Sequence, residues 1–168
     1  MAGGLLAHPL VRGIPPDAPF WWERHARLVR EKGLLSRIHD DWYREASRSL
    51  PAPPGRVLEL GSGGGFFAAI LPEALATDVF PHRGLDAAAD AARLPVRDES
   101  LRGIVLVNVF HHLPRPSDFL RAAARALRPG GRIVLVEPWI TPWSRLVYGR
   151  FHHHDGASGS HGSWWKRP

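Results

Sequence analysis

A glycine cluster between two apolar stretches is the feature that most limits how this chain can fold. Residues 57–72 read VLELGSGGGFFAAILP, with four glycines within residues 61–65. The stretch before the glycines is typical of a buried strand, and the one after them is typical of a helix. Glycine has no Cβ, so the backbone can approach a ligand closely there. We therefore expect a ligand site where the first strand ends.

Strand and helix patterns alternate through the middle of the chain. The expected strands are residues 56–60, 75–80, 83–87, 103–109 and 132–137. The expected helices are residues 63–71, residues 88–92, and one capped by Ser117 and ended by Pro129, Gly130 and Gly131. This alternation predicts an α/β fold with a parallel sheet covered on both faces, because each crossover needs a helix. We expect the strand order 3-2-1-4-5, with the ligand crevice at the carboxyl edge between strands 1 and 4.

The two ends of the chain differ from this middle part. Apolar residues between Phe20 and Leu50 fit two amphipathic helices with a break near Gly33, so residues 1–50 are predicted to form a helical cap. The linker PAPPG then begins the α/β core, expected over residues 51–140. Residues 141–168 are predicted to hold a helix near 142–148 and an irregular tail.

Composition excludes several classes of protein. The chain has no cysteine, which excludes disulfides, thiolate zinc sites and a cysteine nucleophile. The net charge is +6, but residues 57–137 have nine basic and nine acidic side chains, so a nucleic-acid partner is not expected. No apolar run approaches the roughly 18 to 20 residues of a membrane span. The amino terminus lacks a signal-peptide pattern, so we expect a cytoplasmic protein without a membrane partner.

The glycine cluster was compared with two nucleotide-binding patterns. A phosphate-binding loop needs a lysine and then a serine or threonine, but Phe66 and Phe67 follow the glycines here. The dinucleotide pattern is met in its looser form by Gly63, Gly65 and Ala68, two residues beyond the expected strand end. NAD(P) binding therefore remains a lesser alternative.

Five features in order resemble class I S-adenosylmethionine-dependent methyltransferases of the type 11 branch. VLELGSGGG at 57–65 resembles motif I, and Asp78 matches the acid that binds the ribose. DAARLP at 90–95 resembles the adenine-side motif, VLVNVFHHL at 105–113 the strand 4 motif, and ALRPGGRIVLVEP at 126–138 the strand 5 signature. The resemblance implies a Rossmann-like three-layer sandwich and S-adenosylmethionine as cofactor. It also implies methyl transfer, with a small molecule as the expected acceptor.

The resemblance also implies which residues bind the cofactor. Glu59 would orient the loop and meet the ammonium of the ligand, Asp78 the ribose, and Asp90 with Ala91 or Ala92 the adenine. The implied set is Glu59, Gly61, Ser62, Gly63, Gly65, Asp78, Asp90, Ala91 and Asn108. Each acid has a local alternative: Glu59 as a cap of backbone amides, Asp78 as a cap of the following turn, and Asp90 as a helix cap.

The acceptor is expected at the ends of strands 4 and 5. Asn108 and Glu137 lie there, with His111 and His112 as the candidate catalytic bases. Residues 152–155, HHHD, are adjacent in sequence and are not expected to bind a metal without a scaffold. The tryptophans are expected to pack the helical cap; they are Trp21, Trp22, Trp42, Trp139 and Trp143.

The sequence departs from the family pattern after strand 5. Members continue into a strand 6 and strand 7 hairpin, which is not expected here, so strand 5 is predicted to be an uncovered edge. Such an edge suggests a partner chain or self-association. Three explanations stay open: a truncated gene product, a split enzyme, or a reduced protein that binds the cofactor without turnover.

Overall fold

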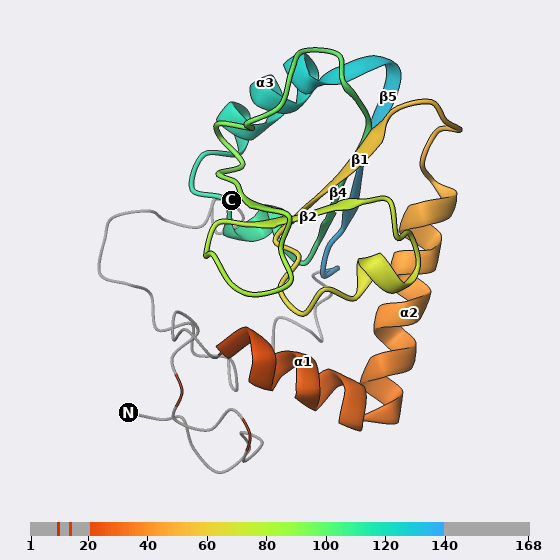
Figure 1. Ribbon diagram of the computed structural model, residues 1–168, viewed down its shortest axis with the longest axis vertical. Coiled ribbons are helices and arrows are strands. Elements are labelled where there is room, and N and C mark those ends of the chain that lie inside the picture. Colours follow the sequence, from red (N-terminus) through yellow and green to blue (C-terminus); the bar gives the residue numbers. More distant parts are fainter. Residues whose placement is uncertain (1–9, 11–13, 15–20, 140–168) are drawn as a thin grey trace.

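The computed structural model describes residues 10, 14 and 21–139 of the 168-residue chain (Figure 1). The expected helix near residues 142–148 and the histidine-rich stretch at 152–155 lie outside the described residues, as does Trp143. Among the residues described, no helix has the length and apolar character that crossing a membrane requires.

A five-stranded parallel sheet forms the centre of the molecule (Figure 1). Its order is β3-β2-β1-β4-β5, which confirms the predicted order 3-2-1-4-5. The strands are β1 (Arg56–Leu60), β2 (Leu75–Asp78), β3 (Ala87–Ala88), β4 (Leu101–Val107) and β5 (Leu127–Val136). The strand order reverses direction between β1 and β4, so their carboxyl ends flank the crevice where such folds bind ligands.

Helices cover the two faces of the sheet and make three layers. On one face, Phe119 and Ala123 of α3 (Pro116–Ala126) pack with Leu58 and Ile104. Because neighbouring residues of a strand point to opposite faces, Val57 and Val105 lie on the other face. There they pack with Tyr43 and Ala46 of α2 (Gly33–Arg48) and with Phe67. The Rossmann-like architecture expected from the sequence is therefore confirmed.

The amino-terminal helices match the sequence pattern. α1 (Trp21–Glu31) and α2 are separated at Lys32, so the predicted break near Gly33 is confirmed. Figure 1 shows α1 at the lower end of the molecule, turned away from the direction of α2.

The prediction of a helix over residues 63–71 is wrong. Only one 3-10 turn, η1 (Phe67–Ala69), forms in this segment. Gly63 and Gly65 have φ angles of +51° and +68°, which a right-handed helix excludes. Pro72 then disfavours helical backbone at the residue before it, so little sequence remains for a helix.

The helix expected over residues 88–92 is also wrong. The Asp90 side chain accepts a hydrogen bond from Ala92 N at 2.8 Å, and Asp90 pairs with Arg93 across a tight turn. A side chain that bonds its own backbone two residues on stabilises a turn in place of a helix.

The boundaries around α3 differ from the prediction. Its N-cap is Arg115 without a side-chain bond, and Pro116 is the first helical residue, so the expected Ser117 cap is wrong. The helix ends at Ala126 because Leu127 takes extended backbone, with φ −75° and ψ 134°, and begins the next strand. β5 begins at Leu127 rather than at residue 132, and residues 128–131 form a bulge opposite β4.

Three other strands also have shifted bounds. β4 runs from Leu101 to Val107 rather than over 103–109, since Asn108 takes a φ of +57° and turns the chain out of the sheet. β2 ends at Asp78 rather than at residue 80, and β3 has two residues in place of the five expected over 83–87.

Candidate functional site

The glycine loop is attached to the end of β2. Ser62 N donates to Thr77 O at 2.9 Å, and Gly63 N donates to Asp78 Oδ2 at 3.2 Å. Gly61 has a φ of +70°, so it takes a backbone conformation that favours glycine, as Gly63 and Gly65 do. These bonds bring the loop and Asp78, both predicted site elements, together at the carboxyl edge of the sheet.

Asp78 is buried, with 3% of the residue exposed. Its second oxygen, Oδ1, accepts from Phe80 N at 3.1 Å. The turn-capping role considered for Asp78 is thus present, together with the bond to the glycine loop. Each carboxylate oxygen has two lone pairs, so both oxygens keep capacity for further donors such as a vicinal diol.

Glu59 lies beneath the loop as a buried acid. Burial raises its pKa to about 7, because the charged form is poorly solvated there. The Ser62 and Tyr43 side chains lie close enough to Glu59 to lower its pKa against this rise. Glu59 Oε1 and Ser62 Oγ are buried, and neither has a partner at full hydrogen-bond geometry among the residues described. Buried polar groups are nearly always bonded, so this small polar cluster keeps capacity for a ligand.

One face of α1 covers the glycine loop. The Trp22 ring lies 3.3 Å from where a Cβ of Gly63 would stand, and Ala26 Cβ lies 3.0 Å from that position of Gly64. Arg30 Nη2 donates to Gly64 O at 3.2 Å. The expected packing role of Trp22 thus includes the loop itself. A spacing of four residues puts these side chains on one helical face, but the sequence does not say what that face contacts.

Asp90 and Ala91 lie in the segment that follows β3. Ala89 N donates to Asp78 O at 2.9 Å, so this segment begins beside the end of β2. The Asp90 carboxylate is exposed and bonds its own turn at Ala92. The structure therefore brings the segment to the site, while the Asp90 carboxylate is not joined to the glycine loop by a hydrogen bond.

A second group of side chains gathers where β4 and β5 end. Asn108 N donates to Val136 O at 2.8 Å, and one 3-10 turn, η2 (Phe110–His112), follows. Glu137 Oε2 lies 2.5 Å from His111 Nδ1. The His111 and His112 rings lie 3.9 Å apart between centroids. Both candidate bases are thus at the carboxyl edge.

Val109 links the two groups and was not foreseen from the sequence. A Cβ on Gly61 would stand 2.4 Å from Val109 Cγ2, so the glycine loop packs directly on the segment that leads to His111. The absence of a side chain at Gly61 is the sequence signal for a close contact, but the partner is 48 residues away in the chain.

A cavity of about 390 Å³ lies apart from these residues, between residues 92–94 and α3. Its charged side chains are largely paired: Asp118 contacts Arg115 and Arg121, and Arg125 contacts Asp98. Of the predicted site residues, it is lined only by Ala92, the alternative to Ala91. We interpret its charges as a surface ion-pair network and not as the site.

Known sequences that match this chain are methyltransferases. Residues 58–135 match a family model described as a methyltransferase domain. An uncharacterized methyltransferase of Mycobacterium bovis (strain BCG / Pasteur 1173P2) is 31% identical over 170 residues, which cover 88% of this chain. The chain spans 66% of the length of that relative.

Two solved structures share this fold over more than two thirds of this chain. One is a SAM-dependent methyltransferase of Thermotoga maritima, described as a possible histamine N-methyltransferase. It has 26% identity and a TM-score of 0.51, over 68% of this chain and 60% of that one. A second structure, from Methanococcus maripaludis, has a TM-score of 0.60 at 15% identity, over 79% of this chain and 67% of that one. The second likeness shows the fold alone.

Proposed function

The chain belongs to the class I S-adenosylmethionine-dependent methyltransferase family, and on that basis we propose that it transfers a methyl group from this cofactor to a small-molecule acceptor. The proposal divides the chain into a helical cap at residues 1–50, a cofactor-binding core at 51–140 and a tail at 141–168. A small amine as acceptor is supported by the description of the Thermotoga maritima structure as a possible histamine N-methyltransferase.

The residues present fit the cofactor. Glu59 and Ser62 form a buried polar cluster under the glycine loop whose Oε1 and Oγ atoms lack partners at full hydrogen-bond geometry, which suits a ligand with an ammonium group and further polar atoms. Gly61, Gly63 and Gly65 leave the backbone open to close approach. Asp78 has lone pairs free for the ribose hydroxyls. Bound S-adenosylmethionine would supply a methyl group on a positively charged sulfur, which needs little further activation.

We assign the remaining site residues as follows. Asp90 and Ala91 hold the adenine side, and Asn108 borders the crevice between donor and acceptor. His111 and His112 take the proton that an acceptor loses on methylation. Most of the rate acceleration would come from holding donor and acceptor in line, which is worth about 7 to 11 kcal/mol in well-oriented systems.

The bond from Gly63 N to Asp78 Oδ2 is the observation that supports this function most directly, because it joins the glycine loop to the ribose-binding acid. Isothermal titration calorimetry with S-adenosylmethionine tests whether the chain binds this cofactor.

Asp78→Asn is expected to weaken binding at least tenfold, since an amide replaces a carboxylate that accepts hydrogen bonds through both of its oxygens. Asp86→Asn is the matched control: Asp86 also accepts a bond from β2, at Ala76 N, but lies away from the loop. Folded wild-type protein that does not bind would contradict the proposal, and tight NADH binding would favour the dinucleotide alternative.

A protein that binds the cofactor without turnover is the second candidate function. The open edge of β5 favours it: in the described part of the chain β5 pairs only with β4, and Leu135 is 40% exposed. We propose that this edge takes a strand from a partner chain or a second copy. Release of S-adenosylhomocysteine from a panel of acceptors separates the two functions. Light scattering from 5 to 500 μM, as an order-of-magnitude range, reports self-association.

A further inference from the structure

Glu137 uses both oxygens of its carboxylate on the segment after β4. Oε1 accepts from Val109 N at 3.1 Å and from Phe110 N at 2.8 Å. Oε2 lies 2.5 Å from His111 Nδ1, and the two side chains are 23% and 25% exposed. One acid at the end of β5 therefore fixes both the start of η2 and the ring of its second residue.

This arrangement sets which ring nitrogen of His111 has the hydrogen. An ionised carboxylate only accepts hydrogen bonds, so Nδ1 must be the donor. In the neutral ring Nε2 then has the lone pair. The same arrangement of carboxylate, imidazole and free Nε2 orients the base in hydrolases.

His111 is also close to the glycine loop in the fold. Glu137 holds the amide of Val109, and the Val109 side chain packs on Gly61, so two contacts connect the acid to the loop. β1 and β4 are neighbours in the sheet, and their carboxyl ends open on the same edge. A base on η2 is therefore positioned at the acceptor side of the crevice.

We propose that Glu137 is a positioning residue that holds His111 with Nε2 free to take a proton from the methyl acceptor. The acceptor is accordingly a compound whose attacking oxygen or nitrogen carries a proton at neutral pH, such as a hydroxyl or an ammonium group. This inference rests on the proposed function, because it names the base and the acceptor class of that same site.

The proton of the acceptor moves to His111 Nε2, and the electron pair of that O–H or N–H bond stays on the heteroatom. Bound S-adenosylmethionine would supply the methyl carbon: the heteroatom would form a bond to it as the methyl–sulfur bond breaks, with that electron pair going to sulfur. The imidazolium keeps its Nδ1–H on the Glu137 carboxylate until Nε2 loses the proton to solvent.

Glu137→Gln tests the tautomer without removing the caps. Val109 N and Phe110 N are both donors, so they require the amide oxygen and turn the NH₂ group toward His111. A donor facing Nδ1 moves the ring hydrogen to Nε2. Nitrogen-15 NMR of histidine-labelled full chain should show an Nδ1–H ring for His111 in the wild type and an Nε2–H ring in the variant. His111→Gln assigns the signal.

His39 is the internal control for this measurement. Its Nδ1 lies 2.8 Å from Leu35 O, which also requires an Nδ1–H ring, and it should not change in Glu137→Gln. An Nε2–H ring for His111 in the wild type, or an unchanged ring in the variant, would overturn the proposal.

Turnover and binding separate this inference from the proposed function. Glu137→Gln and His111→Gln should lower kcat by about 100-fold for hydroxyl and amine acceptors, with KM within about threefold. Carboxylate acceptors, which have no proton to lose, should lose less than about threefold. Equal losses for both classes would overturn the base assignment. S-adenosylmethionine affinity should stay near wild type in both variants, whereas a wild type that does not bind it contradicts the proposed function, independently of the tautomer.

Discussion

Gly61 is the residue whose missing side chain matters most to the site. Its φ of +70° and the Val109 Cγ2 atom 2.4 Å from a would-be Cβ both oppose any larger residue. Val109 has little freedom to move, because Glu137 holds its amide. The loop and the acceptor segment therefore share one packing contact.

We expect Gly61→Ala to destabilise the fold by about 2 to 5 kcal/mol, from the backbone conformation and from overpacking together. Gly65→Ala is the matched control, since its φ is +68° but nothing lies within 4 Å of a would-be Cβ. It should cost only the backbone part, about 1 to 2 kcal/mol. Urea unfolding measures both, and equal losses would show that the Val109 contact is unimportant.

Glu59 makes stability depend on pH. Its pKa is about 7 in the folded chain against an ordinary value of 4.5, so between these values the folded state binds more protons. The stabilisation is complete below pH 4.5 and is lost as pH rises through 7, amounting to roughly 3 kcal/mol. The free energy of unfolding of Glu59→Gln, relative to that of the wild type, should rise by about that amount between pH 5 and pH 8. Urea unfolding measures it. A constant difference between Glu59→Gln and wild type over this range would refute burial as the cause.

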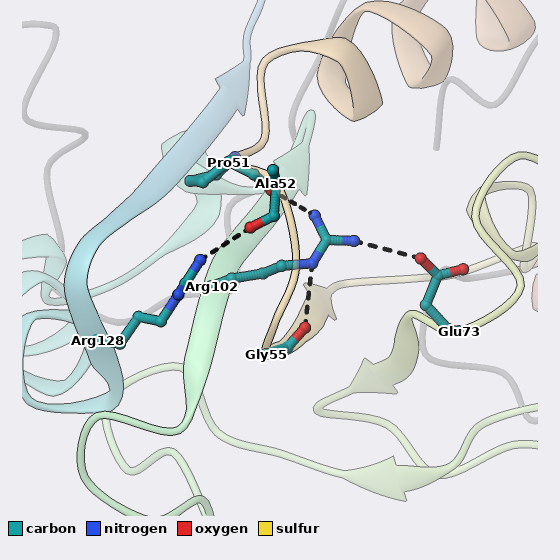
Figure 2. Close-up of polar contacts among 6 residues, drawn as sticks. All are labelled: Pro51, Ala52, Gly55, Glu73, Arg102 and Arg128. Atoms are coloured by element: carbon teal, nitrogen blue, oxygen red, sulfur yellow. Dashed lines mark hydrogen bonds and ion pairs between the residues drawn. The ribbon is translucent and has the colours of Figure 1, made fainter.

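Arg102 joins three segments at the amino edge of the sheet, away from the glycine loop. Figure 2 shows its guanidinium between Pro51, Gly55 and Glu73. Nε donates to Gly55 O at 3.0 Å, Nη1 to Pro51 O at 2.8 Å and Nη2 to Glu73 Oε1 at 3.2 Å. The linker between α2 and β1 is thus tied to β4 by a side chain that is 7% exposed.

Arg102→Met should cost about 2 to 4 kcal/mol of unfolding free energy, because it removes a charged donor from the two linker carbonyls. The Met side chain keeps much of the aliphatic packing. Glu73→Gln should cost less than about 1 kcal/mol, since Glu73 is 53% exposed and its ion pair is solvated. Thermal and urea unfolding measure the two variants, and a loss in Arg102→Met no larger than in Glu73→Gln would mean that the linker bonds contribute little.

The elements were predictable from the sequence to different degrees. β1, the strand order and the break between α1 and α2 follow from apolar patterns and punctuating residues, and they are confirmed. The helix expected over 63–71 failed because positive φ angles at two glycines are invisible in an apolar pattern. The predicted start of β5 was too late because residues 128–131, whose sequence is typical of a turn, form a bulge within the strand.

The site was predictable only in part for a related reason. The bond between Asp78 and the glycine loop joins residues that both stood out in the sequence. Contacts such as Trp22 on Gly63 depend on how a helix lies over the sheet, and local sequence does not contain that information. The sequence left two roles open for Asp90, adenine binding and a local cap. In the structure its side chain accepts a hydrogen bond within its own turn.

At the scale of the whole molecule, cofactor binding should stabilise the fold. A ligand that binds only the folded state at 100 times its Kd adds about 2.7 kcal/mol. For a chain of 168 residues this corresponds to a rise in Tm of roughly 5 to 10 °C. Scanning calorimetry with S-adenosylmethionine should show this rise in wild type and in Asp86→Asn but little in Asp78→Asn. The same rise in Asp78→Asn would place the ligand elsewhere.

The position of Glu137 at the end of the last described strand has a consequence for synthesis on the ribosome. Translation adds about 5 to 20 residues per second, so Glu137 follows Gly61 by roughly 4 to 15 seconds. Until residues 101–107 are made, β2 is the only sheet neighbour that β1 can have, and its other edge waits for β4. A nascent chain therefore exposes its glycine loop before the acid that orients His111 exists, so the donor half of the site precedes the acceptor half in time.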